Sequence, residues 1–127
     1  MINAGQELFD RLYYYSQEKL KYDTYDMLPT IDASYPFVHF GMVEEDYSSL
    51  KDNHTGKVSQ IINVWGTVDM RAEVSMMMNA LIFDRVKTKN YTFTLVNKQT
   101  QLISDSSVEN TRLIHGILTL DFNYFES

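Results

Sequence analysis

The sequence of 127 residues contains no cysteine, and it has only five glycines and two prolines. Without cysteine the chain forms no disulfide, and it offers no thiolate ligand for zinc or an iron–sulfur cluster. The glycine-rich patterns that hold nucleotide phosphates, GxGxxG and GxxxxGK[ST], do not occur. The commonest nucleotide and thiolate-metal classes are therefore excluded from the sequence alone.

Long apolar runs and basic clusters are also missing. No stretch reaches the roughly 20 apolar residues that a membrane-spanning helix needs, so we expect no membrane partner. The first seven residues contain neither a basic nor an apolar region, so we expect no signal peptide and a protein that is made and used in the cytosol, or in something assembled there. The formal net charge is −6. Because gripping nucleic acid needs a basic surface, we expect no specific DNA binding.

The residues that usually carry catalysis or bind metals are few and badly spaced. No HExxH or GxSxG motif is present. We interpret His39 and His115 as packed or edge histidines within strands. His54 and Asp52 would make a poor metal site, because both lie in one flexible loop. The carboxylate run at residues 44–46 is interpreted as a solvated loop end. We therefore expect no catalytic, cofactor or metal site.

The composition is that of an ordinary globular protein, with 44% hydrophobic and 22% charged residues. The length favours one domain spanning residues 1–127. Residues 3–21 are expected to form a helix with Asn3 as its N-cap, since Leu8 and Leu12 repeat at helical spacing. Residues 22–34 are expected to form a polar connection. Residues 35–43 carry apolar side chains on both faces, which is typical of a central or doubly covered strand.

The middle of the chain is expected to form a loop, a strand and a helix. Residues 44–56 are predicted to be a long polar loop, and loops of that length usually have a function. Residues 57–65 alternate and predict a strand. Thr67 is a candidate cap for a helix over residues 69–83, which has a clear apolar stripe.

The last third is predicted to contain three strands. They cover residues 91–96, 101–104 and 111–124, and a tight polar turn at residues 97–99 separates the first two. The resulting order is helix-strand-strand-helix-strand-strand-strand. It favours an α+β fold in which two helices flank a mostly antiparallel sheet, with one long loop between the first two strands. The final strand is the longest, so we expect it to project and pair with a neighbouring molecule.

Several segments resemble one protein family. The chain opens with MINAGQELFDRL and continues with YPFVHFGMVEED and TGKVSQIINVWGTVDMRAEVSMMMNALI. Together they resemble the tail-terminator, or tail-completion and head–tail joining, proteins of long-tailed bacteriophages. The positions that carry the resemblance are Tyr35, Pro36, Phe37, Val38, Gly41, Lys57, Ser59, Ile62, Val64, Trp65, Arg71, Val74, Ser75, Met78 and Ile82.

The resemblance implies a non-enzymatic structural protein without a cofactor. It would form a homo-oligomeric ring, most often a hexamer, that caps the tail tube at the head–tail joint. Its partners would be copies of itself, the major tail tube protein and the head connector or head-completion protein. DNA would pass through the channel without specific binding. The protein would reside in the virion tail, at the head–tail interface, after assembly in the host cytoplasm.

Two groups of residues are candidates for these contacts. The first is a partner-docking loop formed by Glu44, Glu45, Asp46, Tyr47, Leu50, Lys51, Asp52, Asn53 and His54. The second is an inter-protomer strand carrying Thr119, Asp121, Asn123, Tyr124 and Phe125.

Two alternatives stay open at this point. One is a head-completion or stopper protein of the same joint. The other belongs to a different class, a small ligand-binding or regulatory α+β domain or a small enzyme with an unrecognised site, for which a deep pocket with convergent polar groups would be evidence.

Overall fold

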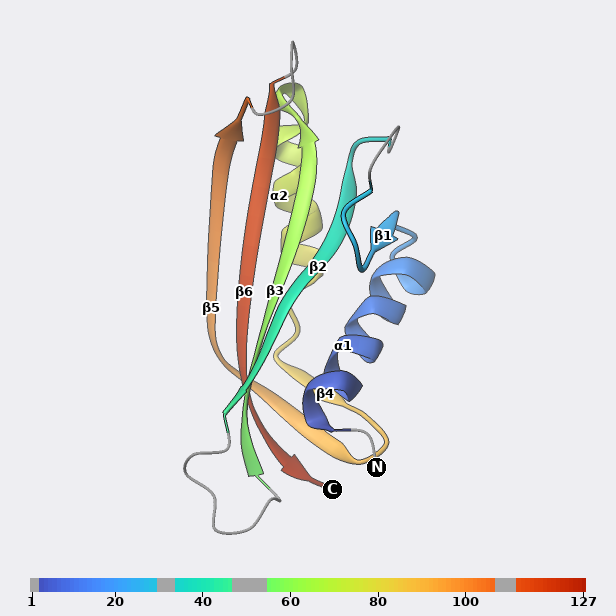
Figure 1. The fold of residues 1–127 in the computed structure, drawn as a ribbon, viewed down its shortest axis with the longest axis vertical. Coiled ribbons are helices and arrows are strands. Elements are labelled where there is room, and N and C mark those ends of the chain that lie inside the picture. The colour runs from blue at the N-terminus through green and yellow to red at the C-terminus, as the bar shows by residue number, and fades with distance from the viewer. Residues whose placement is uncertain (1–2, 30–33, 47–54, 107–111) are drawn as a thin grey trace.

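The computed structural model describes residues 3–29, 34–46, 55–106 and 112–127. The fold is α+β, with two α-helices and a six-stranded, mostly antiparallel sheet in the order β1-β2-β3-β6-β5-β4 (Figure 1). The elements are α1 (Ala4–Tyr14), β1 (Thr24–Tyr25), β2 (Phe37–Asp46), β3 (Thr55–Thr67), α2 (Arg71–Ala80), β4 (Arg85–Lys87), β5 (Tyr91–Asp105) and β6 (Leu113–Glu126). The predicted fold class is confirmed, but the order of elements differs from the prediction.

The first helix begins where the sequence predicts. The side chain of Asn3 accepts a hydrogen bond of 2.8 Å from the backbone N–H of Gln6, which satisfies one of the orphan donors of the first turn. Leu8 and Leu12 are fully buried against the sheet. The helix then loosens into one π-helical turn, Tyr15–Lys19. The segment that follows includes the short strand β1, which the sequence analysis missed and which pairs in parallel with β2.

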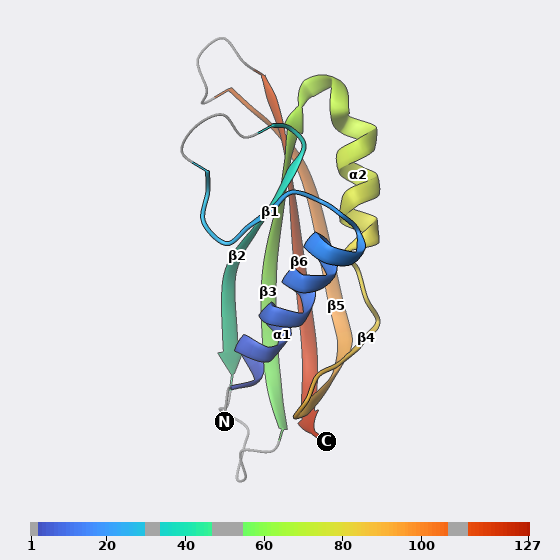
Figure 2. The same cartoon turned by 90° about the vertical axis from the view of Figure 1, so that its right-hand side faces the viewer.

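Both helices lie on the same face of the sheet (Figure 2). The aromatic ring of Phe9 in α1 packs edge-on against Phe40 of β2, with ring centres 5.5 Å apart. On β3 and β6, the side chains that point to the helices are buried, and the alternate ones are partly exposed. Of the two alternatives predicted for β2, a central position holds in the strand order, where β2 lies between β1 and β3, whereas cover on both faces is wrong. Its second face is apolar because Phe37 packs there against Tyr25 and Tyr35.

The second helix packs over the middle strands, β3 and β6. Val74 and Met78 of the predicted stripe are buried, while Met76 on the other side is 71% exposed. The predicted cap is wrong, because the hydroxyl of Thr67 donates to the Asp69 carboxylate and makes no capping bond. A short 3-10 turn, Val68–Met70, precedes the helix instead.

The predicted third and fourth strands form one strand, β5, of 15 residues. The sequence analysis placed a tight turn at residues 97–99, but these residues pair continuously with β6. The change there is an irregularity between Leu95 and Asn97. Before it the side chains of β5 are mostly buried, and after it they are mostly exposed. Residues 97–99 are therefore polar because their side chains are exposed to solvent, and not because the chain turns there.

Candidate assembly interface

The sheet has two open edges, at opposite margins. β1 covers the outer side of β2 only at Val38 and His39, so residues 40–46 have no strand beside them in the described part of the chain. On the other margin β4 covers β5 only from Thr92 to Thr94, with one further backbone bond to Leu95. Residues 96–105 of β5 are thus also without a neighbouring strand among the described residues. Open edges carry unpaired backbone donors and acceptors that can bind another chain.

The open run of β5 is exposed on both faces as well as along its edge. The two central strands lie beneath α2, and the side chains of residues 96–101 are exposed whichever way they point. Val96 and Ile103 are 54% and 45% exposed, although both are apolar. The run contains no proline and a single lysine, Lys98. It therefore lacks most of the devices that prevent edge-to-edge pairing.

The open run of β2 corrects the predicted docking loop. Glu44, Glu45 and Asp46 belong to the strand, where they pair with Ser59, Val58 and Lys57 of β3. Residues 44–46 have too few apolar residues alternating around them for the sequence to predict a strand. Their extended conformation comes from pairing with β3. The remaining members of the predicted loop, Tyr47, Leu50, Lys51, Asp52, Asn53 and His54, lie outside the described residues.

The predicted inter-protomer strand is also corrected. β6 is a central strand that pairs with β3 on one side and β5 on the other, so its backbone has no free edge. Even near its end, Phe125 pairs with both Thr55 and Thr92. Tyr124 is buried, with its ring edge-on to that of Tyr91 at 5.3 Å. The side chains of Thr119, Asp121 and Asn123 lie on the face without helices. The backbone of β6 is therefore not available to pair with a neighbouring strand, and contacts through its exposed side chains stay a prediction.

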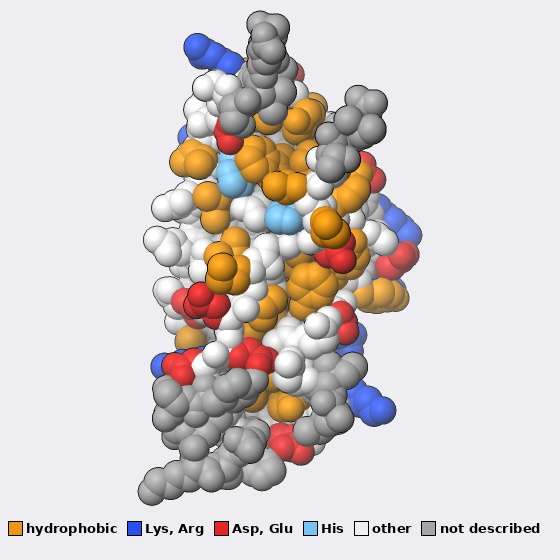
Figure 3. All heavy atoms as spheres, in the orientation of Figure 1, with side chains coloured by type: hydrophobic (Ala, Val, Ile, Leu, Met, Phe, Trp, Pro, Cys, Tyr) orange, Lys and Arg blue, Asp and Glu red, His pale blue; other side chains and the backbone are white. Residues whose placement is uncertain are grey.

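The uncovered face of the sheet is divided into two halves (Figure 3). One half carries apolar side chains and the two described histidines. There the Nε2 atom of His115 lies 2.7 Å from the Oδ1 of Asn63, and the Asn63 amide lies 3.3 Å from Nδ1 of His39. The other half carries carboxylates, and the hydroxyl of Ser59 donates to Asp121. In this view Lys and Arg side chains show only at the margins.

The single tryptophan gives a direct readout of this face. Trp65 stacks on His115, with ring centres 3.8 Å apart and planes 10° from parallel. Burial lowers the pKa of His115 below its ordinary value of 6.5, and Asp105 opposes this only partly. Since the folded protein binds the proton less tightly than the unfolded chain, stability should fall as the pH drops below about 6.5.

We expect the fluorescence of Trp65 to fall on acidification with a midpoint below 6.5, because a stacked imidazolium quenches indole emission and an imidazole does not. A fluorescence titration between pH 8 and 4 measures this midpoint. The His115→Gln variant is the control and should show no such step. A midpoint at or above 6.5, or a step that persists in the variant, would contradict the assignment.

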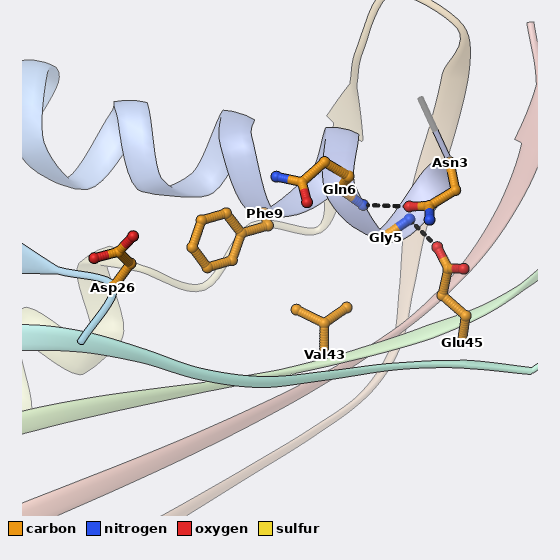
Figure 4. A pocket seen from close by; sticks show the side chains of 7 residues that line it. All are labelled: Asn3, Gly5, Gln6, Phe9, Asp26, Val43 and Glu45. Atoms are coloured by element: carbon orange, nitrogen blue, oxygen red, sulfur yellow. Dashed lines mark hydrogen bonds between the residues drawn. The ribbon is translucent and has the colours of Figure 1, made fainter. Parts of the chain in front are cut away.

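The hollow between α1 and β2 is lined in part by polar groups that already form hydrogen bonds within the protein (Figure 4). Asn3 caps Gln6, and the carboxylate of Glu45 accepts a hydrogen bond from the backbone N–H of Gly5. Within the described ranges no group of three or more His, Cys, Asp or Glu residues is arranged to hold a metal ion. No helix among those residues is long and apolar enough to cross a membrane.

One signal for the β5 edge was present in the sequence. Residues 97–101 are polar, but Asn97 is the only one of the usual turn residues among them, since glycine, proline, aspartate and serine are missing. Their absence favours a strand that simply continues. No sequence feature indicated the open edge of β2, because that edge is open only where the two-residue strand β1 does not reach.

These features define a two-layer α+β fold with one uncovered sheet face and two open edges. A chain in the virion of a native gene transfer agent (GTA) particle is similar to it, with a TM-score of 0.58 over 91% of this chain and 92% of that chain. The two sequences are 16% identical, so this likeness concerns the fold. No protein-family model matches the sequence, and no curated protein is significantly similar to it.

Proposed function

We propose that this chain is a structural protein of a phage-like virion, where it forms a ring at the head–tail joint. The observation that carries the proposal is the fold likeness to a chain of the GTA virion, which spans nearly the whole of both chains. The resemblance of the sequence to tail terminators points in the same direction independently. In that role the ring caps the tail tube and docks to the head connector, and no bond is made or broken.

The two open sheet edges support self-association. The edges differ in sequence and lie on opposite margins, so contact between them is heterologous, and a heterologous contact that closes produces a ring. The carboxylates of Glu44 and Asp121 on the uncovered face suit a channel wall that does not hold DNA. Residues 47–54 remain the candidate docking segment toward the head.

Mixing with the tail tube protein of the same particle tests the proposal. We expect the chain to bind one end of preformed tubes and to stop their growth, which negative-stain microscopy and tube-length distributions measure. Native mass spectrometry of the chain, alone and with tubes, gives the ring order. Tubes that keep growing, with no cap at their ends, would contradict the tail-terminator role.

A head-completion or stopper protein of the same joint is the second candidate. It would also form a ring, but it would bind the head connector and leave tube growth unchanged. The same mixing experiment therefore separates the two roles. A ligand-binding domain is less favoured, because the Asn3 side chain and the Glu45 carboxylate, which line the hollow between α1 and β2, are already engaged in hydrogen bonds within the protein.

A further inference from the structure

We infer that the ring closes by antiparallel pairing of the open edge of β5 in one copy with the open edge of β2 in the next. This inference rests on the proposed ring and names the surface that forms it. Every copy then contributes four long strands, β2, β3, β6 and β5, to one continuous sheet around the ring. The partner of each edge is a second copy of this chain.

Strand direction is the first argument. The four long strands alternate strictly, because each of the three pairings between them is antiparallel. An even number of alternating strands leaves the two outer ones, β2 and β5, running in opposite directions (Figure 1). Rotating a copy about an axis parallel to the strands keeps these directions. The β5 edge therefore meets the next β2 edge in antiparallel orientation, and the alternation continues across the junction.

Register is the second argument. Glu44 pairs with Ser59, Ser59 with Asp121, and Asp121 with Asn97, so Glu44 and Asn97 lie in one row across the sheet. A rotation without translation keeps each row at its own height. It places Asn97 of one copy beside Glu44 of the next.

The two side chains of this row also lie on the same face of the sheet. A second row links the same two edges: Phe40 pairs with Ile62, Ile62 with Leu118, and Leu118 with Thr100. The open runs therefore overlap along residues 40–44 and 96–100, and the two faces stay continuous across the junction. Because side chains alternate between the two faces with a period of two, a tilt of the strands that keeps the faces continuous moves this register by an even number of residues, of which two is the smallest.

The side chains at the two edges are complementary. Met42 is 60% exposed at the irregularity of β2, and Val96 is 54% exposed at the irregularity of β5, so apolar groups are available on both partners. The open run of β2 ends in three carboxylates, at residues 44–46, whereas residues 96–100 of β5 carry Lys98 and no carboxylate. Of these carboxylates Glu45 lies on the same face as Lys98 and diagonally across from it in this register, which favours β5 with β2 over β2 with β2, where carboxylates would repel.

The absence of native cysteine makes the junction directly testable. In the double variant Glu44→Cys/Asn97→Cys, the two thiols of one copy are separated by three strand intervals, or about 14 Å. A disulfide needs Cα atoms within about 7 Å, so it can form only between copies. We expect oxidation, alone or with tail tubes, to give a ladder on a denaturing gel that ends at the number of copies in the ring.

Two further variants control for register and proximity. Glu44→Cys/Gln99→Cys covers a register moved by two residues, and a ladder from either pair supports the inference. Glu44→Cys/Thr100→Cys places the second thiol on the same edge but on the opposite face, and it should give no ladder. Circular dichroism checks that each variant is folded.

The outcomes separate this inference from the proposed function. Rings seen by native mass spectrometry of the parent chain, without a ladder from either test pair, would overturn edge pairing and leave the ring intact. A ladder from the Thr100 variant that equals the others would also overturn it, since contact would then be unspecific. Absence of rings, tube caps and ladders together would overturn both.

Discussion

Replacing Gly66 with alanine is expected to lower the free energy of unfolding by about 1–3 kcal/mol, the usual cost of forcing an added group into a filled core. A Cβ at this position would lie 2.7 Å from Cγ2 of Val74 and 3.2 Å from Cβ of Met70. Val74 is fully buried and β-branched, so it has no other rotamer to adopt. Gly66 is thus required for the close approach of α2 to the sheet. Urea denaturation followed by fluorescence measures the change.

Two variants test this explanation of Gly66. Gly116→Ala should cost less, because its Cβ would lie 3.0 Å from Val74 instead of 2.7 Å, and its nearest contact is the sulfur of Met78, whose side chain has rotatable bonds. The double variant Gly66→Ala/Val74→Ala should be less destabilised than the sum of the single variants, since the smaller side chain removes the clash. Additive losses, or an unchanged stability of Gly66→Ala, would show that the helix has room to move.

Replacing Glu7 with alanine is expected to cost about 2–3 kcal/mol, because hydrogen bonds to a charged group contribute about 1.5–3 kcal/mol. Of the donors left behind, the Thr88 hydroxyl is buried and those of Asn90 are partly buried. Glu7 is 8% exposed and joins α1 to the turn between β4 and β5. Its Oε1 atom accepts bonds of 2.7 Å from the Thr88 hydroxyl and 3.1 Å from the Asn90 backbone, and its Oε2 atom accepts one of 2.6 Å from the Asn90 side chain. Thermal unfolding by circular dichroism should show a lower midpoint.

The charge of Glu7 also predicts a pH dependence. Burial raises the pKa of Glu7, but hydrogen bonds from Thr88 and Asn90 outweigh this effect and bring the pKa below its ordinary value of 4.5. A lowered folded pKa means that the stabilisation is present above about pH 4.5 and is lost as the pH falls through the folded value. The Glu7→Gln variant keeps the size and one acceptor, so it should lose less at pH 7 and show a weaker decline below pH 4.5. Equal pH profiles for parent and variant would refute this role.

The periodic parts of the chain were predictable because their burial follows local spacing. Leu8 and Leu12 define the buried side of α1, and Val74 and Met78 define that of α2. The alternation in β3 and β6 likewise identifies the covered face. The turn predicted at residues 97–99 was wrong, because a polar strand that no helix covers has the composition of a loop.

The candidate site was the least predictable part. A sequence shows that a strand is long, but it does not show what pairs beside it. The free edge was therefore predicted at β6, the longest of the predicted strands, whereas both sides of β6 are occupied. The acidic residues 44–46 were likewise placed in a loop, although β3 holds them in a strand.

Composition and periodicity alone determined that this chain has an α+β fold without disulfides, with two amphipathic helices against a mostly antiparallel sheet. Those properties depend on residues close together in the sequence. Only the tertiary structure decided which strands lie at the margins, that both helices share one face and that β2 and β5 keep open edges. Edges arise from the lateral order of strands, which is set by contacts between segments far apart along the chain.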